Sequence, residues 1–219
     1  MTKIAIIGAG SAMFATELMT DIMLSPGIPV GAFALVDIDS ERLELAHRMG
    51  EHLASQTGTG WSFQASADRT QVLAGCDYVI NTIEVAGLAN VRHDYDIPLK
   101  YGVDQCIGDT IGPGGIFKAL RTLPAWLDIL ADAGRLAPDA LVVNYTNPMS
   151  ITVLTGLCAS ELPIVGLCHS IQHTVQQLAE YLDIPLSYVR ASVRYYAAFQ
   201  EEVDTWRASA DDAAASCTP

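Results

Sequence analysis

Short apolar runs alternate with longer amphipathic segments along most of the chain. The runs are rich in β-branched residues and lie at Lys3–Gly8, Phe33–Asp37, Tyr78–Asn81, Ala140–Tyr145 and Ile164–Cys168. Apolar residues recur at helical spacing over Met13–Leu24, Ser40–Thr57, Asn90–Tyr101, Ile116–Ala133, Ser150–Ser160 and Ile171–Leu182. This alternation predicts an α/β fold with a doubly wound, Rossmann-like parallel sheet and crossover helices.

Two segments between these elements are too rich in Gly, Asp and Pro for ordinary crossovers. They are CIGDTIGPGG at Cys106–Gly115 and NYTNPM at Asn144–Met149. Both are expected to leave the carboxyl ends of strands, where open α/β sheets bind their ligands. Beyond about residue 196 the apolar periodicity fades, so residues 196–219 are expected to be an irregular tail or the truncated start of a second domain.

The overall charge narrows the range of partners. With 25 Asp and Glu against 12 Lys and Arg, the formal net charge is -13, which disfavours nucleic acid and anionic membranes. The five cysteines form no CxxC pair, and the amino-terminal stretch lacks the layout of a signal peptide. No apolar run approaches the roughly 18 residues that span a bilayer. We therefore expect a soluble protein of the reducing cytoplasm.

The amino-terminal stretch IAIIGAGSAMF has the pattern of a dinucleotide-binding turn. Gly8, Ala9, Gly10 and Ser11 follow a predicted strand and precede a helix, so their backbone can approach a pyrophosphate at the helix start. Asp37 ends the next predicted strand, placed to accept hydrogen bonds from the adenosine ribose and to repel the extra phosphate of NADP. NAD is the expected cofactor.

A simpler interpretation of this stretch stays open. The two glycines could serve only a tight turn, and Asp37 could cap the next helix. Asp39 or Ser40 is the better candidate for that cap, however, because each stands directly before the helical pattern.

Five motifs together resemble glycoside hydrolase family 4, the NAD- and manganese-dependent glycosidases, and most of all its α-galactosidase and α-glucosidase branch. They are GAGSAMF, LVDID, GDTIGPGGIFKALRTLP, VVNYTNPM and VGLCHS, in the family's order and within about residues 3–190. The resemblance implies a domain over residues 1–195 that binds NAD, and a glycoside or sugar as the substrate.

The resemblance also implies how O-glycosidic bonds would be hydrolysed. NAD first oxidises the sugar at C3, which acidifies the proton at C2. Removal of that proton lets the glycosidic oxygen leave, after which water adds and the hydride returns. Enzymes of this kind depart from the two-carboxylate scheme of most glycosidases.

The resemblance assigns roles to four residues, and three of them have a plainer alternative. Cys168 corresponds to a ligand of Mn2+ or another divalent metal, although a free cysteine at a strand end is also a small buried hydrophobe. His169 and Asn147 are expected to contact the sugar, while an Asn-Pro turn alone would explain the latter. Asp109 corresponds to the group that assists the leaving oxygen, unless it only bonds loop amides. Asn81 ends a strand near the expected nicotinamide and is a candidate contact of the cofactor.

One family segment has no counterpart here. A Gly-x-Asn-His segment is expected after the cysteine, but the corresponding stretch is ASVRYYAAFQEEVDTW, and no histidine follows His173. We therefore expect the second substrate domain to be largely missing and glycosidase activity to be impaired. Two alternatives remain: a lactate- or malate-type NAD-dependent dehydrogenase, although no proton-relay histidine is evident, and a non-catalytic NAD-binding remnant or interaction module. A homo-oligomer is compatible with either.

Overall fold

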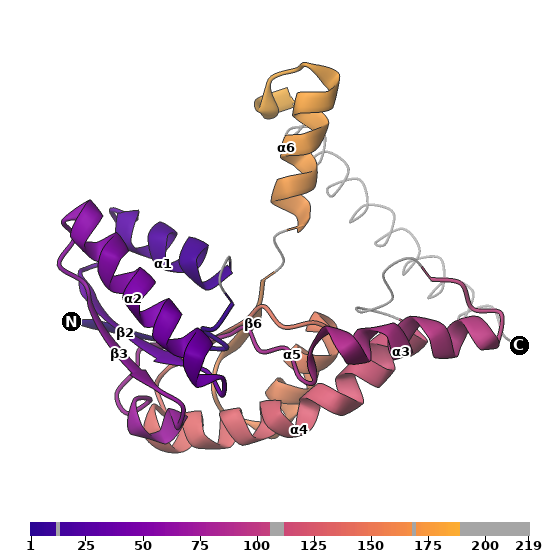
Figure 1. Ribbon diagram of the computed structural model, residues 1–219, viewed down its shortest axis with the longest axis horizontal. Helices are drawn as coiled ribbons and strands as arrows, with labels where there is room; N and C mark the ends of the chain where they lie inside the picture. Colours follow the sequence, from indigo (N-terminus) through magenta and orange to yellow (C-terminus); the bar gives the residue numbers. More distant parts are fainter. Residues whose placement is uncertain (12–13, 106–111, 168–169, 189–219) are drawn as a thin grey trace, which may run out of the picture. The chain divides into compact units, whose positions relative to one another are not determined.

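The computed structural model describes residues 1–11, 14–105, 112–167 and 170–188. These residues form a six-stranded parallel sheet with flanking helices (Figure 1). The strands are β1 (Thr2–Ile7), β2 (Gly31–Val36), β3 (Ser62–Ser66), β4 (Tyr78–Asn81), β5 (Leu141–Asn144) and β6 (Ile164–Gly166). The helices are α1 (Phe14–Leu24), α2 (Ser40–Thr57), η1 (Arg69–Gln71), α3 (Gly87–Lys100), α4 (Pro113–Leu136), α5 (Met149–Ala159) and α6 (Ser170–Leu182).

The strand order β3-β2-β1-β4-β5-β6 confirms the predicted doubly wound sheet. The order reverses between β1 and β4, which pair in parallel from Ile4 opposite Tyr78 to Ile7 opposite Asn81. At such a reversal the connections of the two strands leave in opposite directions and open a crevice at their carboxyl ends. The fold therefore places a ligand crevice beyond Ile7 and Asn81.

Strand residues alternate between two apolar layers. On one face Ile4, Ile6 and Phe33 pack with side chains of α1 and α2, and on the other Ala5, Val79 and Val142 pack with Trp126 and its neighbours on α4. Figure 1 shows α1 and α2 on one side of the sheet and α4 on the other. Because both faces of the central strands are covered, these strands are continuous apolar runs in the sequence.

Two elements differ from the sequence-based expectation. The apolar pattern did not reveal β3, because its residues SFQAS are largely exposed at the edge of the sheet. The segment GPGG was expected in a loop, but α4 already begins at Pro113 and includes Gly114 and Gly115, both buried. Proline is favoured at the first helical position because its fixed φ suits the helix and no hydrogen bond is lost there.

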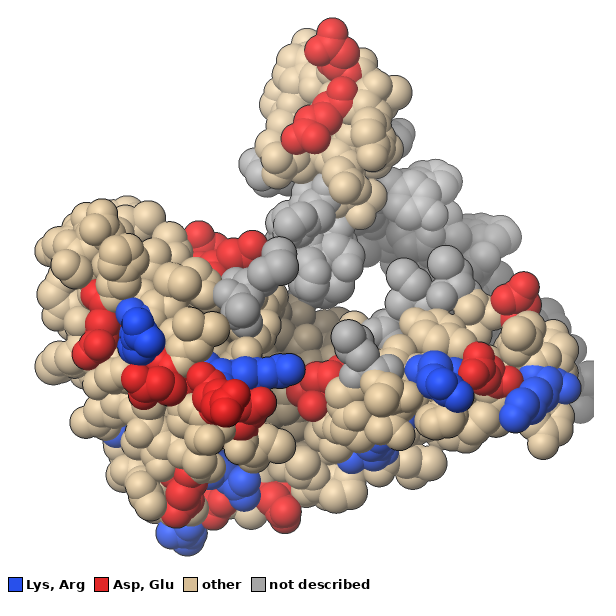
Figure 2. All heavy atoms as spheres, viewed as in Figure 1, with Lys and Arg blue, Asp and Glu red and all other residues tan. Residues whose placement is uncertain are grey.

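The chain divides into two compact units, Met1–Leu167 and Cys168–Pro219. In the second unit, α6 packs Val175 and Ala179 against Leu186. Its described residues 170–188 contain two acidic side chains and no lysine or arginine, whereas both signs are intermixed on the first unit (Figure 2). The expected domain end at residue 195 and the tail 196–219 lie outside the described residues. Within the described part of the chain, no helix is long and apolar enough to cross a membrane.

Candidate dinucleotide site

The turn after β1 is fastened to both neighbouring strands. Gly8 has a φ of 91°, and the backbone N–H groups of Gly8 and Ala9 donate to the carbonyl of Val36 at 2.8 and 3.0 Å. The hydroxyl of Thr82 donates to the carbonyls of Ile7 and Gly8 at 2.9 and 3.1 Å. A Cβ on Gly8 would lie 2.8 Å from the backbone of Thr82. Only glycine suits this position, both in conformation and in space.

Asp37 is held beside this turn by two backbone donors. Its Oδ2 accepts from the N–H of Gly10 at 2.8 Å, and its Oδ1 accepts from the N–H of Asp39 at 2.9 Å. A Cβ on Gly10 would approach Oδ2 to 2.6 Å, so this close contact requires glycine. Each carboxylate oxygen has a second acceptor position. Asp37 can therefore accept ribose hydroxyls while it remains anchored.

The predicted cap of α2 is confirmed. Asp39 is the N-cap, and its Oδ1 accepts from the N–H groups of Glu41 and Arg42, both at 3.1 Å. Asp37 is thus relieved of the capping role that the simpler interpretation gave it. The remaining member of the predicted turn, Ser11, donates its N–H to the carbonyl of Gly8 at 3.4 Å.

A cavity of about 270 Å³ opens where these residues meet the loop after β4. This volume is slightly below the roughly 300 Å³ at which ligand pockets usually begin, so the cavity holds only part of a dinucleotide. The lining residues come from the ends of β1, β2 and β4, from η1 and from α4: Ile7, Gly8, Val36, Asp37, Ile38, Ala67, Arg69, Ile83, Glu84, Val85, Ala86, Ala125 and Ile129.

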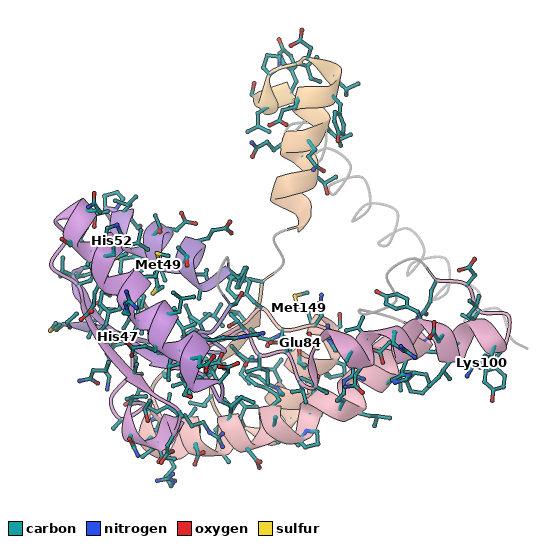
Figure 3. All side chains as sticks on the ribbon, viewed as in Figure 1. His47, Met49, His52, Glu84, Lys100 and Met149 are labelled. Atoms are coloured by element: carbon teal, nitrogen blue, oxygen red, sulfur yellow. The ribbon has the colours of Figure 1, made fainter. Side chains whose placement is uncertain are left out.

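Two ion pairs from α4 hold the loop after β4 and the helix α3 that follows it, and the sequence motifs had not revealed them. The Nζ of buried Lys118 lies 3.0 Å from Oε2 of Glu84, which Figure 3 places near the start of α3. Arg121 donates to both carboxylate oxygens of Asp94 at 3.0 and 2.7 Å, and to the carbonyl of Val85 at 3.3 Å. These bonds to Asp94 raise the pKa of Arg121, so its guanidinium group stays charged. Lys118 and Arg121 stand three residues apart in FKALR, which was the available sequence signal.

A buried amide network lies at the carboxyl ends of β4 and β5. Asn81, fully buried, donates from Nδ2 to Oδ1 of Asn144 at 2.8 Å, and Asn144 donates to the carbonyl of Thr146 and the hydroxyl of Thr152. Trp126 Nε1 donates to the carbonyl of Thr152 at 2.9 Å. The Oδ1 of Asn81 has no protein partner. The network ties β4, β5, α4 and α5 together beside the crevice, and a cofactor contact by Asn81 stays a prediction.

The other predicted site residues divide between described and undescribed parts of the chain. Asn147 accepts a hydrogen bond at Oδ1 from the N–H of Met149 at 3.3 Å, which fixes the turn into α5. The proposed acid Asp109, metal ligand Cys168 and sugar contact His169 lie outside the described residues. Among the residues that are described, no three or more His, Cys, Asp or Glu side chains gather as a metal site would require.

Comparison with known proteins supplies the family. The model of "Family 4 glycosyl hydrolase" matches residues 3–184. The chain belongs to this family. An alpha-galactosidase of Rhizobium meliloti (strain 1021) is 38% identical over 197 residues, which are 88% of this chain and 40% of the relative. The chain thus spans about 40% of the length of that curated relative.

Solved structures agree on the fold. A 6-phospho-beta glucosidase from Thermotoga maritima, in a crystal with manganese, NAD+ and glucose-6-phosphate, matches with a TM-score of 0.72 at 26% identity, covering 85% of this chain and 44% of the other. A lactate dehydrogenase from Cryptosporidium parvum matches with a TM-score of 0.62 at 18% identity, over 85% of this chain and 51% of the other. The dehydrogenase shares the Rossmann-like fold, and its likeness shows no more than that.

Proposed function

We propose that this chain supplies the NAD-binding part of a family 4 glycosidase acting on α-galactosides or α-glucosides. The observation that carries the proposal is the cavity bounded by Gly8 and Asp37, at the reversal of strand order in a chain of this family. NAD would accept the hydride from C3 of the sugar. The chain's own contribution is to bind and orient the dinucleotide.

Asp37 is the proposed selector of NAD over NADP. Its carboxylate is fixed by Gly10 and Asp39 and retains acceptor positions for the two ribose hydroxyls. A phosphate on the 2′ oxygen would bring a second negative charge against this carboxylate at hydrogen-bonding distance. At an effective dielectric constant of about 20, two like charges about 4 Å apart repel by roughly 4 kcal/mol before screening.

The sugar and metal site is the second part of the proposal. Cys168 would be a ligand of Mn2+ or another divalent metal, His169 and Asn147 would orient the sugar, and Asp109 would assist the leaving oxygen. All four lie within the residues that the family model matches. A bound divalent metal supplies Lewis-acid stabilisation of a sugar oxygen. General acid assistance of the kind proposed for Asp109 typically contributes about 10²- to 10⁴-fold.

An unphosphorylated α-galactoside is the proposed substrate class. The alpha-galactosidase of Rhizobium meliloti is 38% identical over 197 residues, against 35% over 192 residues for a probable 6-phospho-beta-glucosidase of Bacillus subtilis (strain 168).

The test is to measure NAD binding by calorimetry, and then hydrolysis of nitrophenyl α-galactoside, α-glucoside and their 6-phosphates with NAD, Mn2+ and a reducing agent. We expect micromolar NAD binding and, if turnover occurs, a preference for the unphosphorylated α-galactoside. Binding of NAD without turnover of any glycoside would favour the dinucleotide-binding module. Failure to bind NAD would refute the proposal.

A further inference from the structure

We propose that Arg69 forms a flat platform for the adenine ring, and that Asp132 fixes the plane of its guanidinium group. The inference rests on the proposed NAD-binding function and assigns the base-recognising side of that site. Arg69 lines the same cavity as Asp37 and Gly8. Asp37 and Arg69 reach this cavity from different elements. Asp37 follows strand β2, whereas Arg69 begins the short helix η1 after the edge strand β3.

Local structure places Arg69 at the cavity. Asp68 is the N-cap of η1, where its Oδ1 accepts from the N–H and the hydroxyl of Thr70 at 3.0 and 2.7 Å. Ser66 at the end of β3 accepts from the N–H of Asp68 at 3.1 Å. This chain of short-range bonds sets the direction in which the backbone leaves β3. As a result, Ala67 and Arg69 both face the cavity.

The guanidinium group is fixed by one carboxylate on α4. Both Nε and Nη2 of Arg69 lie 2.7 Å from Oδ2 of Asp132, and Arg135 donates to Oδ1 of the same carboxylate at 2.9 Å. The Arg69 side chain keeps 31% of its surface exposed. One edge of the plane is therefore committed to Asp132. The faces of the guanidinium and its remaining edge are what Arg69 offers to a ligand.

The cavity's composition favours a planar base over a phosphate. Apart from Asp37, Glu84 and Arg69, its lining side chains are small or apolar, including Ile38, Ala125 and Ile129. Asp132 offsets the charge of Arg69, and Asp37 adds a negative charge to the same cavity. An anion is therefore expected to bind only weakly in this cavity. A guanidinium plane can stack on an aromatic ring and attract it electrostatically even when its edge is hydrogen-bonded.

The experiment compares ligands that contain or lack the base. NAD, ADP-ribose and nicotinamide mononucleotide are titrated calorimetrically into the chain and into Arg69→Met, Arg69→Lys and Asp132→Asn. We expect Arg69→Met to bind NAD and ADP-ribose about 3- to 30-fold more weakly, with no change for nicotinamide mononucleotide. Lysine should not restore binding, because it keeps the charge but lacks the plane. Asp132→Asn should cause a smaller loss in the same direction.

A matched control is Arg135→Gln, which removes the other guanidinium on Asp132 from a residue that does not line the cavity. It should bind NAD within about twofold of the parent chain. Unchanged NAD affinity in Arg69→Met would overturn the platform and leave the proposed function standing. So would full recovery in Arg69→Lys, or an equal loss for nicotinamide mononucleotide. A parent chain that binds no NAD would overturn both.

Discussion

The two sides of the crevice are held by different kinds of contact. On the β1–β2 side the backbone is the main component: glycines at 8 and 10 approach Thr82 and Asp37 so closely that a Cβ would come within 2.8 and 2.6 Å. On the β4–β5 side buried side chains bond to one another through Asn81, Asn144 and Thr152. The first side requires glycine at two close contacts, whereas the second is held by hydrogen bonds between buried side chains, with Oδ1 of Asn81 left without a protein partner.

The largest expected effect tests the first side. Gly8→Ala should lower the free energy of unfolding by about 2–5 kcal/mol, because a φ of 91° and a 2.8 Å contact with Thr82 act together. Urea denaturation measures this change in the free energy of unfolding. The matched control is Gly75→Ala, where φ is 68° and nothing lies within 4 Å of the added Cβ. It should cost only about 1 kcal/mol. Equal losses would show that space beside Gly8 is irrelevant.

The second side should respond to loss of a hydrogen-bonding group. Asn144→Ala leaves the Nδ2 of buried Asn81 and the hydroxyl of Thr152 without this partner, and we expect a loss of about 2–4 kcal/mol in the free energy of unfolding. Asn90→Ala is the control, since its amide bonds only the carbonyl of Ala86 near the surface. A loss no larger than that of the control would mean that the buried network contributes nothing.

This difference between the two sides explains which features of the site could be predicted from the sequence. The glycines and Asp37 were visible because each acts through its own backbone or strand position, next to neighbours in the sequence. The cap at Asp39 was predictable for the same reason. The Arg69–Asp132 and Asn81–Asn144 pairs each join residues 63 positions apart, and no local pattern encodes such a contact. Edge strand β3 has too few buried residues to produce an apolar run.

The acid behaviour of the protein should depend partly on Asp132. Hydrogen bonds from Arg135 and Arg69 hold the pKa of this carboxyl below its usual range. A depressed folded-state pKa gives stability that is present above about pH 3.9, the unfolded value, and is lost as pH falls through the folded value. Urea midpoints measured from pH 5 to pH 2 should therefore fall less steeply in Asp132→Asn. An unchanged slope would rule out this contribution.

The smallest effect concerns a glycine near the end of α4. Gly134 lies exposed in α4, with nothing within 4 Å of an added Cβ. Gly134→Ala should raise the free energy of unfolding by about 0.5 kcal/mol, since alanine reduces the conformational freedom of the unfolded chain and favours the helix. Thermal unfolding would detect a small rise in Tm. Destabilisation would show that α4 needs glycine at this position.

The central claim is that the turn at Gly8 and the carboxylate of Asp37 form an NAD site. Calorimetric titration of NAD and NADP into the parent chain and into Asp37→Asn tests it most directly. We predict that the parent chain binds NAD at least about tenfold more tightly than NADP, and that this ratio shrinks in Asp37→Asn because the repelling charge is gone. Absence of NAD binding, or equal affinity for the two dinucleotides in the parent chain, would contradict the claim.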